Sequence, residues 1–275
     1  MTGQGAAFDL SASRLSDAAL VAPLSMHARM GSSGASSEAR SRALDWMRLR
    51  QLFAEARLYS RHRAAIEVRR YRPMAASLLD LEALGPVLGG KVPLVVSAHR
   101  ASDIEAAIAF AAEERIRLVI SGGAEAWRVA SVLARAGVGV LVDPEVNQPE
   151  TYDTLGARPD NAALLHRAGV RVGFSAAGAA HDARSLRFSV GRSVAWGLPH
   201  SAALEGLTSA PARLFGLEDR GTLRVGALAN LVIWSGDPLE LSTRVRHLVI
   251  HGREIPLVTR QTLLLQRYRG RAVGP

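Results

Sequence analysis

Residues 92–121, VPLVVSAHRASDIEAAIAFAAEERIRLVIS, contain two short apolar runs separated by an alanine-rich stretch. The first run ends at Ser97 and the second spans 117–121, and each predicts a short buried strand. The stretch between them predicts a helix over 103–114, with Ser102 or Asp103 as its N-cap. A strand, a helix and a second strand in this order predict a unit whose two strands are parallel.

The same alternation of strand and helix continues to residue 174. The further predicted elements are helices at 124–136 and 159–168 and strands at 138–142 and 170–174. Parallel strands joined by helices take right-handed crossovers and build barrels or open sheets. Because residues 1–90 show no such alternation, the sequence predicts an α/β protein with a partial, TIM-like (β/α)8 barrel rather than a complete one.

Other segments of the chain show helical or strand-like patterns outside this core. Apolar residues at helical spacing predict a long helix from Glu38 to about Arg70, ended by Pro73. The small residues of 31–37 predict a flexible linker. The remaining expected elements are helices at 184–196, 200–215 and 256–275 and strands at 222–224, 230–234 and 245–250. The expected domains are a helical and irregular region 1–90, the barrel part 91–218, a β-segment 219–258 and a tail 259–275.

The composition of the 275 residues narrows the classes of protein to consider. The absence of cysteine excludes disulfides and thiolate metal sites. The net charge of +9 raises the question of nucleic acid, but the arginines are scattered and aromatic residues make up 5%. We therefore expect that nucleic acid is not the partner. No apolar window reaches about 18 residues and no signal peptide is apparent, so we expect no membrane association and favour the cytoplasm.

A pattern of glycines and turns recurs near the end of the chain. Its residues are Gly221, Leu223, Gly226, Ala229, Asn230 and Leu231, then Gly236-Asp237-Pro238-Leu239, and finally Gly252-Arg253. This pattern resembles the closing segment of the amidohydrolase superfamily, in particular its imidazolonepropionase-like branch. The resemblance covers 91–255 and is most specific over 184–253. It implies the C-terminal half of a barrel with a small β-sandwich segment, and hydrolysis of non-peptide C–N bonds with divalent metal, usually zinc.

The resemblance also indicates where the metal ligands of the family would stand. Ser97, Gly122 and Ala177 occupy the ligand positions at the ends of three barrel strands, and none of them supplies the histidine or aspartate of the family. The chain has no H-x-H motif, and its start resembles a segment downstream of that motif. The resemblance therefore implies a truncated, metal-free protein with no catalytic residue, a pseudoenzyme, although whether any activity remains stays open.

The altered site still offers residues that could bind a ligand. His99 and Arg100 follow a predicted strand, where they could contact an anion. Gly122 and Gly123 form a turn into a predicted helix, whose first N–H groups attract anions. The candidate ligand-binding residues are Ser97, His99, Arg100, Gly122, Gly123 and Ala177.

The sequence leaves three hypotheses about the function. The first is a ligand- or partner-binding relic of an amidohydrolase, which could bind a small molecule. Its open strand edges need cover, which we expect from residues 1–90, from a second copy in a homo-oligomer, or from a paralogous amidohydrolase chain. The first alternative is an active metal-dependent amidohydrolase completed by another chain or by unusual ligands. The second alternative is a basic nucleic-acid-binding protein.

Overall fold

The computed structural model describes residues 1–9, 14–31, 41–68, 71–176 and 180–269. The linker expected at 31–37 lies outside these residues except for Gly31. The chain divides into two compact units, Met1–Gly221 and Thr222–Pro275. No helix of the described residues has the length and apolar character needed to cross a membrane.

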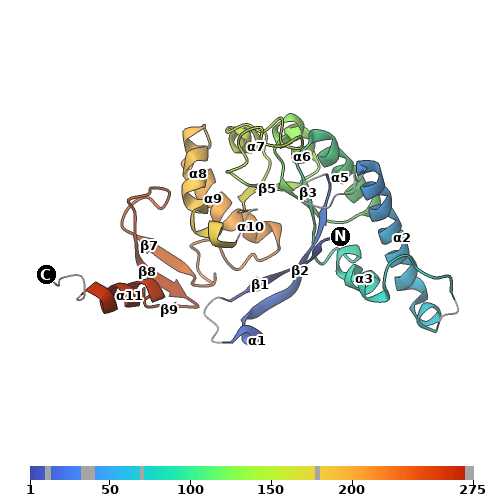
Figure 1. The fold of residues 1–275 in the computed structure, drawn as a ribbon, viewed down its shortest axis with the longest axis horizontal. Helices are drawn as coiled ribbons and strands as arrows, with labels where there is room; N and C mark the ends of the chain where they lie inside the picture. The colour runs from blue at the N-terminus through green and yellow to red at the C-terminus, as the bar shows by residue number, and fades with distance from the viewer. Residues whose placement is uncertain (10–13, 32–40, 69–70, 177–179, 270–275) are drawn as a thin grey trace. The chain divides into compact units, whose positions relative to one another are not determined.

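The first unit is built on a sheet whose described strands follow one another in chain order, from β1 to β6. β1 (Gly3–Phe8) pairs antiparallel with β2, and β2 to β6 run parallel. The sheet curls like part of a TIM-like barrel (Figure 1). The parallel strands are β2 (Ala19–Arg29), β3 (Leu94–Ala98), β4 (Leu118–Gly122), β5 (Gly139–Val142) and β6 (Val172–Phe174).

The four parallel strands predicted from the sequence are confirmed, but the expectation that 1–90 lacks a barrel strand is wrong. β2 pairs with β3 from Met26 to Arg29, so residues 1–90 cover one of the expected open edges. Buried parallel strands usually read as continuous apolar runs. Pro23, Ser25 and His27 interrupt the run in β2, which explains why the pattern was not recognised.

Helices cover one side of the sheet in an arc (Figure 1). The helix predicted from Glu38 to Arg70 is confirmed as α2 (Arg42–Glu67). The fully buried Phe53 of α2 meets the fully buried Phe110 of α5 edge to face, with ring centroids 5.0 Å apart. This aromatic pair joins the two helices that follow β2 and β3. The other helices of the arc are α5 (Ala101–Glu114), α6 (Ala130–Arg135) and α7 (Asn161–Arg167).

The start of α5 differs from the prediction. Its N-cap is Arg100, not Ser102 or Asp103, and no side chain of the cap residue bonds to the helix. Instead, the distant Glu125 accepts a hydrogen bond from the N–H of Ala101 at 3.0 Å. A carboxylate can satisfy one of the free N–H groups of a helix start from any part of the chain, so a local sequence pattern does not reveal it.

The helix predicted over 200–215 is broken into α9 (His200–Leu207) and α10 (Ser209–Leu214). Pro211 explains the break, because its ring would clash with the carbonyl of Leu207 in a continuous helix. The break lets α10 lie on the side of the sheet opposite the arc (Figure 1). The preceding helix is α8 (Leu186–Ala195), and the shorter helices of this unit are α1 (Leu15–Ala18), α3 (Leu78–Ala83), α4 (Gly85–Leu88), η1 (Ala126–Val129) and η2 (Ala180–Arg184).

A glycine of the sheet, Gly139, allows α10 to approach closely. Leu214 packs with Val95, Val119 and Leu141 in one buried cluster. A side chain at Gly139 would overlap Leu214, and a Cβ at Gly173 would lie 3.6 Å from it. The missing side chain of Gly139 on β5 therefore makes room for α10 against the sheet, whereas Gly173 on β6 makes room for Leu141 of β5.

The described part of the second unit forms a three-stranded antiparallel sheet and one helix. The strands predicted at 230–234 and 245–250 are confirmed, but the strand predicted at 222–224 is wrong. Gly221 and Gly226 flank that run with positive φ values of 80° and 85°, which turn the chain out of an extended path. The β-sandwich stays a prediction. The elements are β7 (Leu231–Trp234), β8 (Val245–Ile250), β9 (Arg253–Glu254) and α11 (Arg260–Arg269).

Candidate functional site

The carboxyl ends of the parallel strands bring most of the predicted site residues together. Ser97 of β3 is the register partner of Ser121 on β4, and Ala98 is the partner of Gly122. His99 and Arg100 follow directly after β3. Ala177 lies outside the described residues. Because ligands of α/β sheets bind at the carboxyl ends of strands, we take this edge as the candidate site.

The ring of His99 lies against Gly122. A Cβ built on Gly122 would lie 2.7 Å from Cε1 of His99, which is too close for two carbon atoms. Gly122 also has a φ of +91°, a conformation that other residues adopt only with strain. The position that the resemblance assigns to a histidine ligand therefore faces another imidazole and has no space for a side chain of its own.

His99 is also notable for an unsatisfied polar atom. Its Nδ1 is buried and has no hydrogen-bond partner among the described residues. Burial lowers the pKa of His99, the charge of Arg29 lowers it further, and Asp153 and Asp143 oppose the change. The imidazole is therefore neutral at pH 7. Buried polar atoms are normally paired, so Nδ1 is a point where a bound molecule could make a hydrogen bond.

Arginines and carboxylates surround this histidine in a paired network. Arg42, the first residue of α2, forms ion pairs with Asp103, at 2.9 Å, and with Asp153. Arg100 also pairs with Asp153, at 3.2 Å, and donates to the carbonyl of Tyr152. Burial raises the pKa of the Asp103 carboxyl, and the charge of Arg42 opposes that rise. Sequence reasoning considered Asp103 only as a helix cap and did not single out Asp153, because neither belongs to a recognisable motif of a functional site.

The backbone of the predicted glycine turn is already bonded within the fold. The N–H of Gly123 donates to the carbonyl of Ala98 at 2.8 Å, and its carbonyl accepts from Asn161 at 2.9 Å. The helical segment that follows, η1, is a single short 3₁₀ turn. Gly123 therefore orders the loop around the site, and its N–H is not directed at a ligand.

The described donors at this edge do not fit a divalent metal ion. Zinc needs about three or four nitrogen, oxygen or sulfur donors in a fixed geometry. Asp103 and Asp153 are paired with arginine, and Asp143 accepts the N–H of Glu145 at 3.0 Å. Within the described ranges, no three His, Cys, Asp or Glu side chains are grouped so that they could hold a metal ion.

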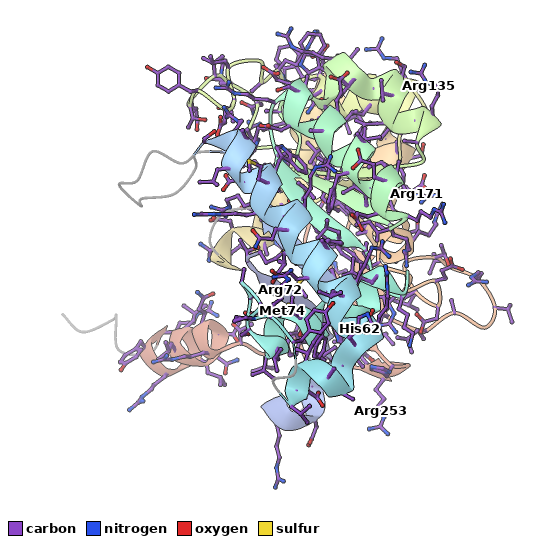
Figure 2. The ribbon with its side chains drawn as sticks, turned by 90° about the vertical axis from the view of Figure 1, so that its right-hand side faces the viewer. His62, Arg72, Met74, Arg135, Arg171 and Arg253 are labelled. Carbon is purple, nitrogen blue, oxygen red and sulfur yellow. The ribbon has the colours of Figure 1, made fainter. Side chains whose placement is uncertain are left out.

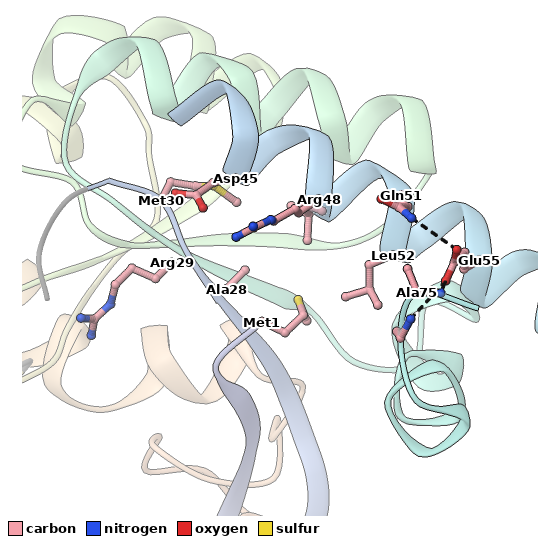
Figure 3. A pocket seen from close by; sticks show the side chains of 12 residues that line it. Met1, Ala28, Arg29, Met30, Asp45, Arg48, Gln51, Leu52, Glu55 and Ala75 are labelled. Atoms are coloured by element: carbon pink, nitrogen blue, oxygen red, sulfur yellow. Dashed lines mark hydrogen bonds between the residues drawn. The ribbon is translucent and has the colours of Figure 1, made fainter. Parts of the chain in front are cut away.

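A cavity of about 350 Å³ lies between α2 and β2, and Arg29 at the end of β2 lines it (Figure 3). The most buried charged group on its wall is Glu55, which is 2% exposed. Its carboxylate accepts the N–H groups of Ala75, at 2.8 Å, and Ala76, at 3.3 Å. Glu55 therefore fixes the chain after α2 and is not free to act on a bound molecule.

The comparison with known proteins agrees with the fold. Residues 124–256 match the sequence model of the Amidohydrolase family. The chain is similar in structure to an amidohydrolase from Thermotoga maritima MSB8, with a TM-score of 0.82 and 25% identity, over 92% of this chain and 68% of that one.

Two curated proteins are similar in sequence. Amidohydrolase tasK of Hapsidospora irregularis is 27% identical over 58% of this chain and 17% of its own length. A 5-methylthioadenosine/S-adenosylhomocysteine deaminase of Desulforudis audaxviator is 31% identical over 50% of this chain and 38% of its own length. The chain thus spans less than half of either relative.

Three residues of the glycine and turn pattern near the end of the chain make structural contacts. A Cβ on Gly221 would lie 2.9 Å from backbone atoms of Thr208 and Ser209. Asn230 accepts the N–H of His251, and Asp237 accepts the N–H of Leu239, each at 2.9 Å. These three motif residues therefore make turns and close backbone contacts.

Replacing Gly122 with alanine is expected to displace the His99 ring and to lower the free energy of unfolding by about 1–3 kcal/mol. Gly169→Ala is the matched control, because Gly169 has a similar φ of +82° but open space around it. Chemical denaturation and the NMR resonances of His99 measure both effects. Equal stability of the two variants, with the His99 resonances unchanged, would contradict the packing described here.

Proposed function

We propose that this chain is an amidohydrolase-related protein of the imidazolonepropionase-like branch that binds a small amide or lactam without metal-dependent hydrolysis. The observation that carries the proposal is the His99 ring packed on Gly122, where a ligand histidine of the family would stand. In the sequence, Ser97 and Ala177 stand at the positions that the resemblance assigns to two further ligands. Without metal-bound water of lowered pKa, the site lacks the usual nucleophile of such hydrolases.

The choice of a neutral ligand follows from the charges around His99. Arg42 and Arg100 are paired with buried aspartates, so the site does not require a charged partner. The buried Nδ1 of the neutral His99 can donate or accept one hydrogen bond, depending on its tautomer. An amide or lactam offers both an N–H and a carbonyl, and it contains a C–N bond of the kind that amidohydrolases hydrolyse.

The test combines elemental analysis of the folded chain with an activity screen on amides, lactams and dipeptides. We expect almost no zinc or manganese in protein from metal-supplemented cells, and no hydrolysis that a chelator abolishes. About one metal ion per chain with chelator-sensitive hydrolysis would overturn the proposal in favour of an active amidohydrolase.

Ligand binding is tested separately by NMR titration with a small lactam. We expect shifts of the His99 resonances in the wild-type chain and loss of binding in His99→Ala. His166→Ala is the control, since His166 is exposed on α7 away from this edge. Binding that survives in His99→Ala would show that this site is not the one used.

We also propose that a second copy of the chain, or a paralogous amidohydrolase chain, pairs with the outer edge of β6. β6 is the last described strand of its sheet and has a strand partner on one side only among the described residues, and an unpaired strand edge favours association. Light scattering on the purified chain, alone and mixed with a paralogue, tests this. A monomer under both conditions would contradict it.

A further inference from the structure

A second cavity, of about 460 Å³, opens at the amino ends of β4, β5 and β6. This is the end of the sheet opposite to His99, so the cavity is separate from the candidate site above. Four arginines line it, and no acidic side chain does. We call it the basal pocket, and its arginines are Arg115, Arg117, Arg171 and Arg213.

The strand register explains how these arginines meet. Arg117 directly precedes β4 and Arg171 directly precedes β6. β5 lies between these strands and begins at Gly139, which pairs with Val119 of β4. Arg115 is brought to the same place by the end of α5, where it turns the chain with a φ of 54° and a ψ of 45°. Arginines from separate loops therefore converge around one short strand.

Two of the four guanidinium groups are engaged within the fold. Arg213 pairs with Glu205 at 2.8 Å and donates to Ser209 at 2.7 Å. Arg117 donates one N–H to the carbonyl of Leu214 at 3.1 Å and carries no ion pair in the described chain. These bonds hold two walls of the basal pocket in place.

The guanidinium groups of Arg115 and Arg171 have no hydrogen-bond or ion-pair partner among the described residues. The acidic residues next to Arg115 cannot neutralise it, because arginines of α2 already hold Glu113 and Glu114. The C-terminal dipole of α5 accounts for only about half a negative charge. An excess of positive charge therefore remains at the mouth of the basal pocket.

One side of the basal pocket is apolar, which limits what can occupy it. Ile108 and Ile116 line this side together with Leu118. A guanidinium group offers paired N–H donors that match the oxygens of a phosphate group. The volume is within the usual range for small-molecule sites. A ligand with a phosphate head and an organic body would satisfy both the charged and the apolar walls.

We infer that the basal pocket binds a phosphate-bearing small molecule, with Arg115 and Arg171 contacting the phosphate and the isoleucine side receiving the organic part. Calorimetric titration of the full chain at low salt, with pyrophosphate and with adenosine diphosphate, tests this. We expect saturable binding of both probes, and weakening by about tenfold or more in Arg171→Gln and in Arg115→Asn. Asparagine tolerates the left-handed backbone of Arg115 better than most residues, so the second variant should keep the fold.

Arg135→Gln is the matched control. Arg135 is an exposed arginine at the end of α6 that does not line the basal pocket, and it lies on the same face as Arg171 in Figure 2. We expect its effect to be less than about twofold. Equal weakening by Arg135→Gln and Arg171→Gln would identify a diffuse charge effect and overturn the inference. Absence of saturable binding to both probes by a chain with normal circular dichroism would also overturn it.

The two probes separate the sources of the phosphate group. Tighter binding of adenosine diphosphate than of pyrophosphate supports an organic phosphate with its body on the apolar side. Ile108→Ala should then remove most of that difference while leaving pyrophosphate binding unchanged. Equal binding of both probes, unaffected by Ile108→Ala, would overturn the assignment of the organic part to this wall.

Discussion

Replacing Phe110 with alanine is expected to lower the free energy of unfolding of the barrel unit by about 3–5 kcal/mol. Phe110 is fully buried, and its ring contacts Phe53 at 5.0 Å and Trp46 at 6.0 Å between centroids. The substitution would leave a cavity between α2 and α5 that their rigid packing cannot close. Chemical denaturation followed by circular dichroism measures the loss.

Leu79→Ala is the control for this experiment, because Leu79 is 79% exposed and should change stability by less than about 0.5 kcal/mol. The double variant Phe53→Ala/Phe110→Ala tests the pair itself. We expect a coupling of about 0.5–1.5 kcal/mol between the two rings. A loss below about 1 kcal/mol for Phe110→Ala would show that α2 and α5 do not pack as described.

Replacing Glu55 with alanine is expected to cost about 2–4 kcal/mol, because the N–H groups of Ala75 and Ala76 would lose their buried acceptor. Arg72 would lose an ion-pair partner at the same time. Glu55→Gln keeps an oxygen acceptor and should cost less than Glu55→Ala. Urea denaturation at pH 7 ranks the three proteins, and equal stability of all three would contradict this role.

Because the carboxylate of Glu55 has a shifted pKa, we expect the free energy of unfolding to depend on pH. Burial raises the pKa of Glu55, but hydrogen bonds from Ala75, Ala76, Gln51 and Arg72 outweigh it, so that the net pKa is lowered. The stabilisation is therefore complete above the unfolded-state pKa, near 4.3, and is lost as the pH falls through the lower native value. We expect the stability gap between wild type and Glu55→Gln to narrow below about pH 4. A gap that stays constant down to pH 3 would refute this.

The parallel strands could be predicted because burial on both sides of a sheet demands apolar runs, and β3 to β6 have them. β2 could not, because Pro23 and His27 interrupt its pattern. The division of 200–215 into α9 and α10 could have been predicted from Pro211 alone. A single residue with a fixed steric effect was thus more informative there than the periodicity around it.

The candidate site was harder to predict than the fold. The resemblance identified Gly122, but only the three-dimensional arrangement shows the His99 ring against it. Asp153 gains its role from Arg42, which lies 111 residues away in the sequence. The arginines of the basal pocket are likewise scattered in the sequence, and their convergence depends on strand register. Contacts between distant segments carry no local signal, so composition and spacing could not predict them.

The spatial order of the strands in the six-stranded sheet, from β1 to β6, is the order in which they are synthesised. Each strand that leaves the ribosome therefore finds its only earlier neighbour already made, and no strand has to insert between two others. From β3 to β6 this growth by addition keeps paired residues within about 32 positions of each other in the sequence, which favours fast folding and limits the time that an unpaired strand edge is exposed. The growing end of the sheet, rather than its middle, is then where a nascent chain would need protection by a chaperone.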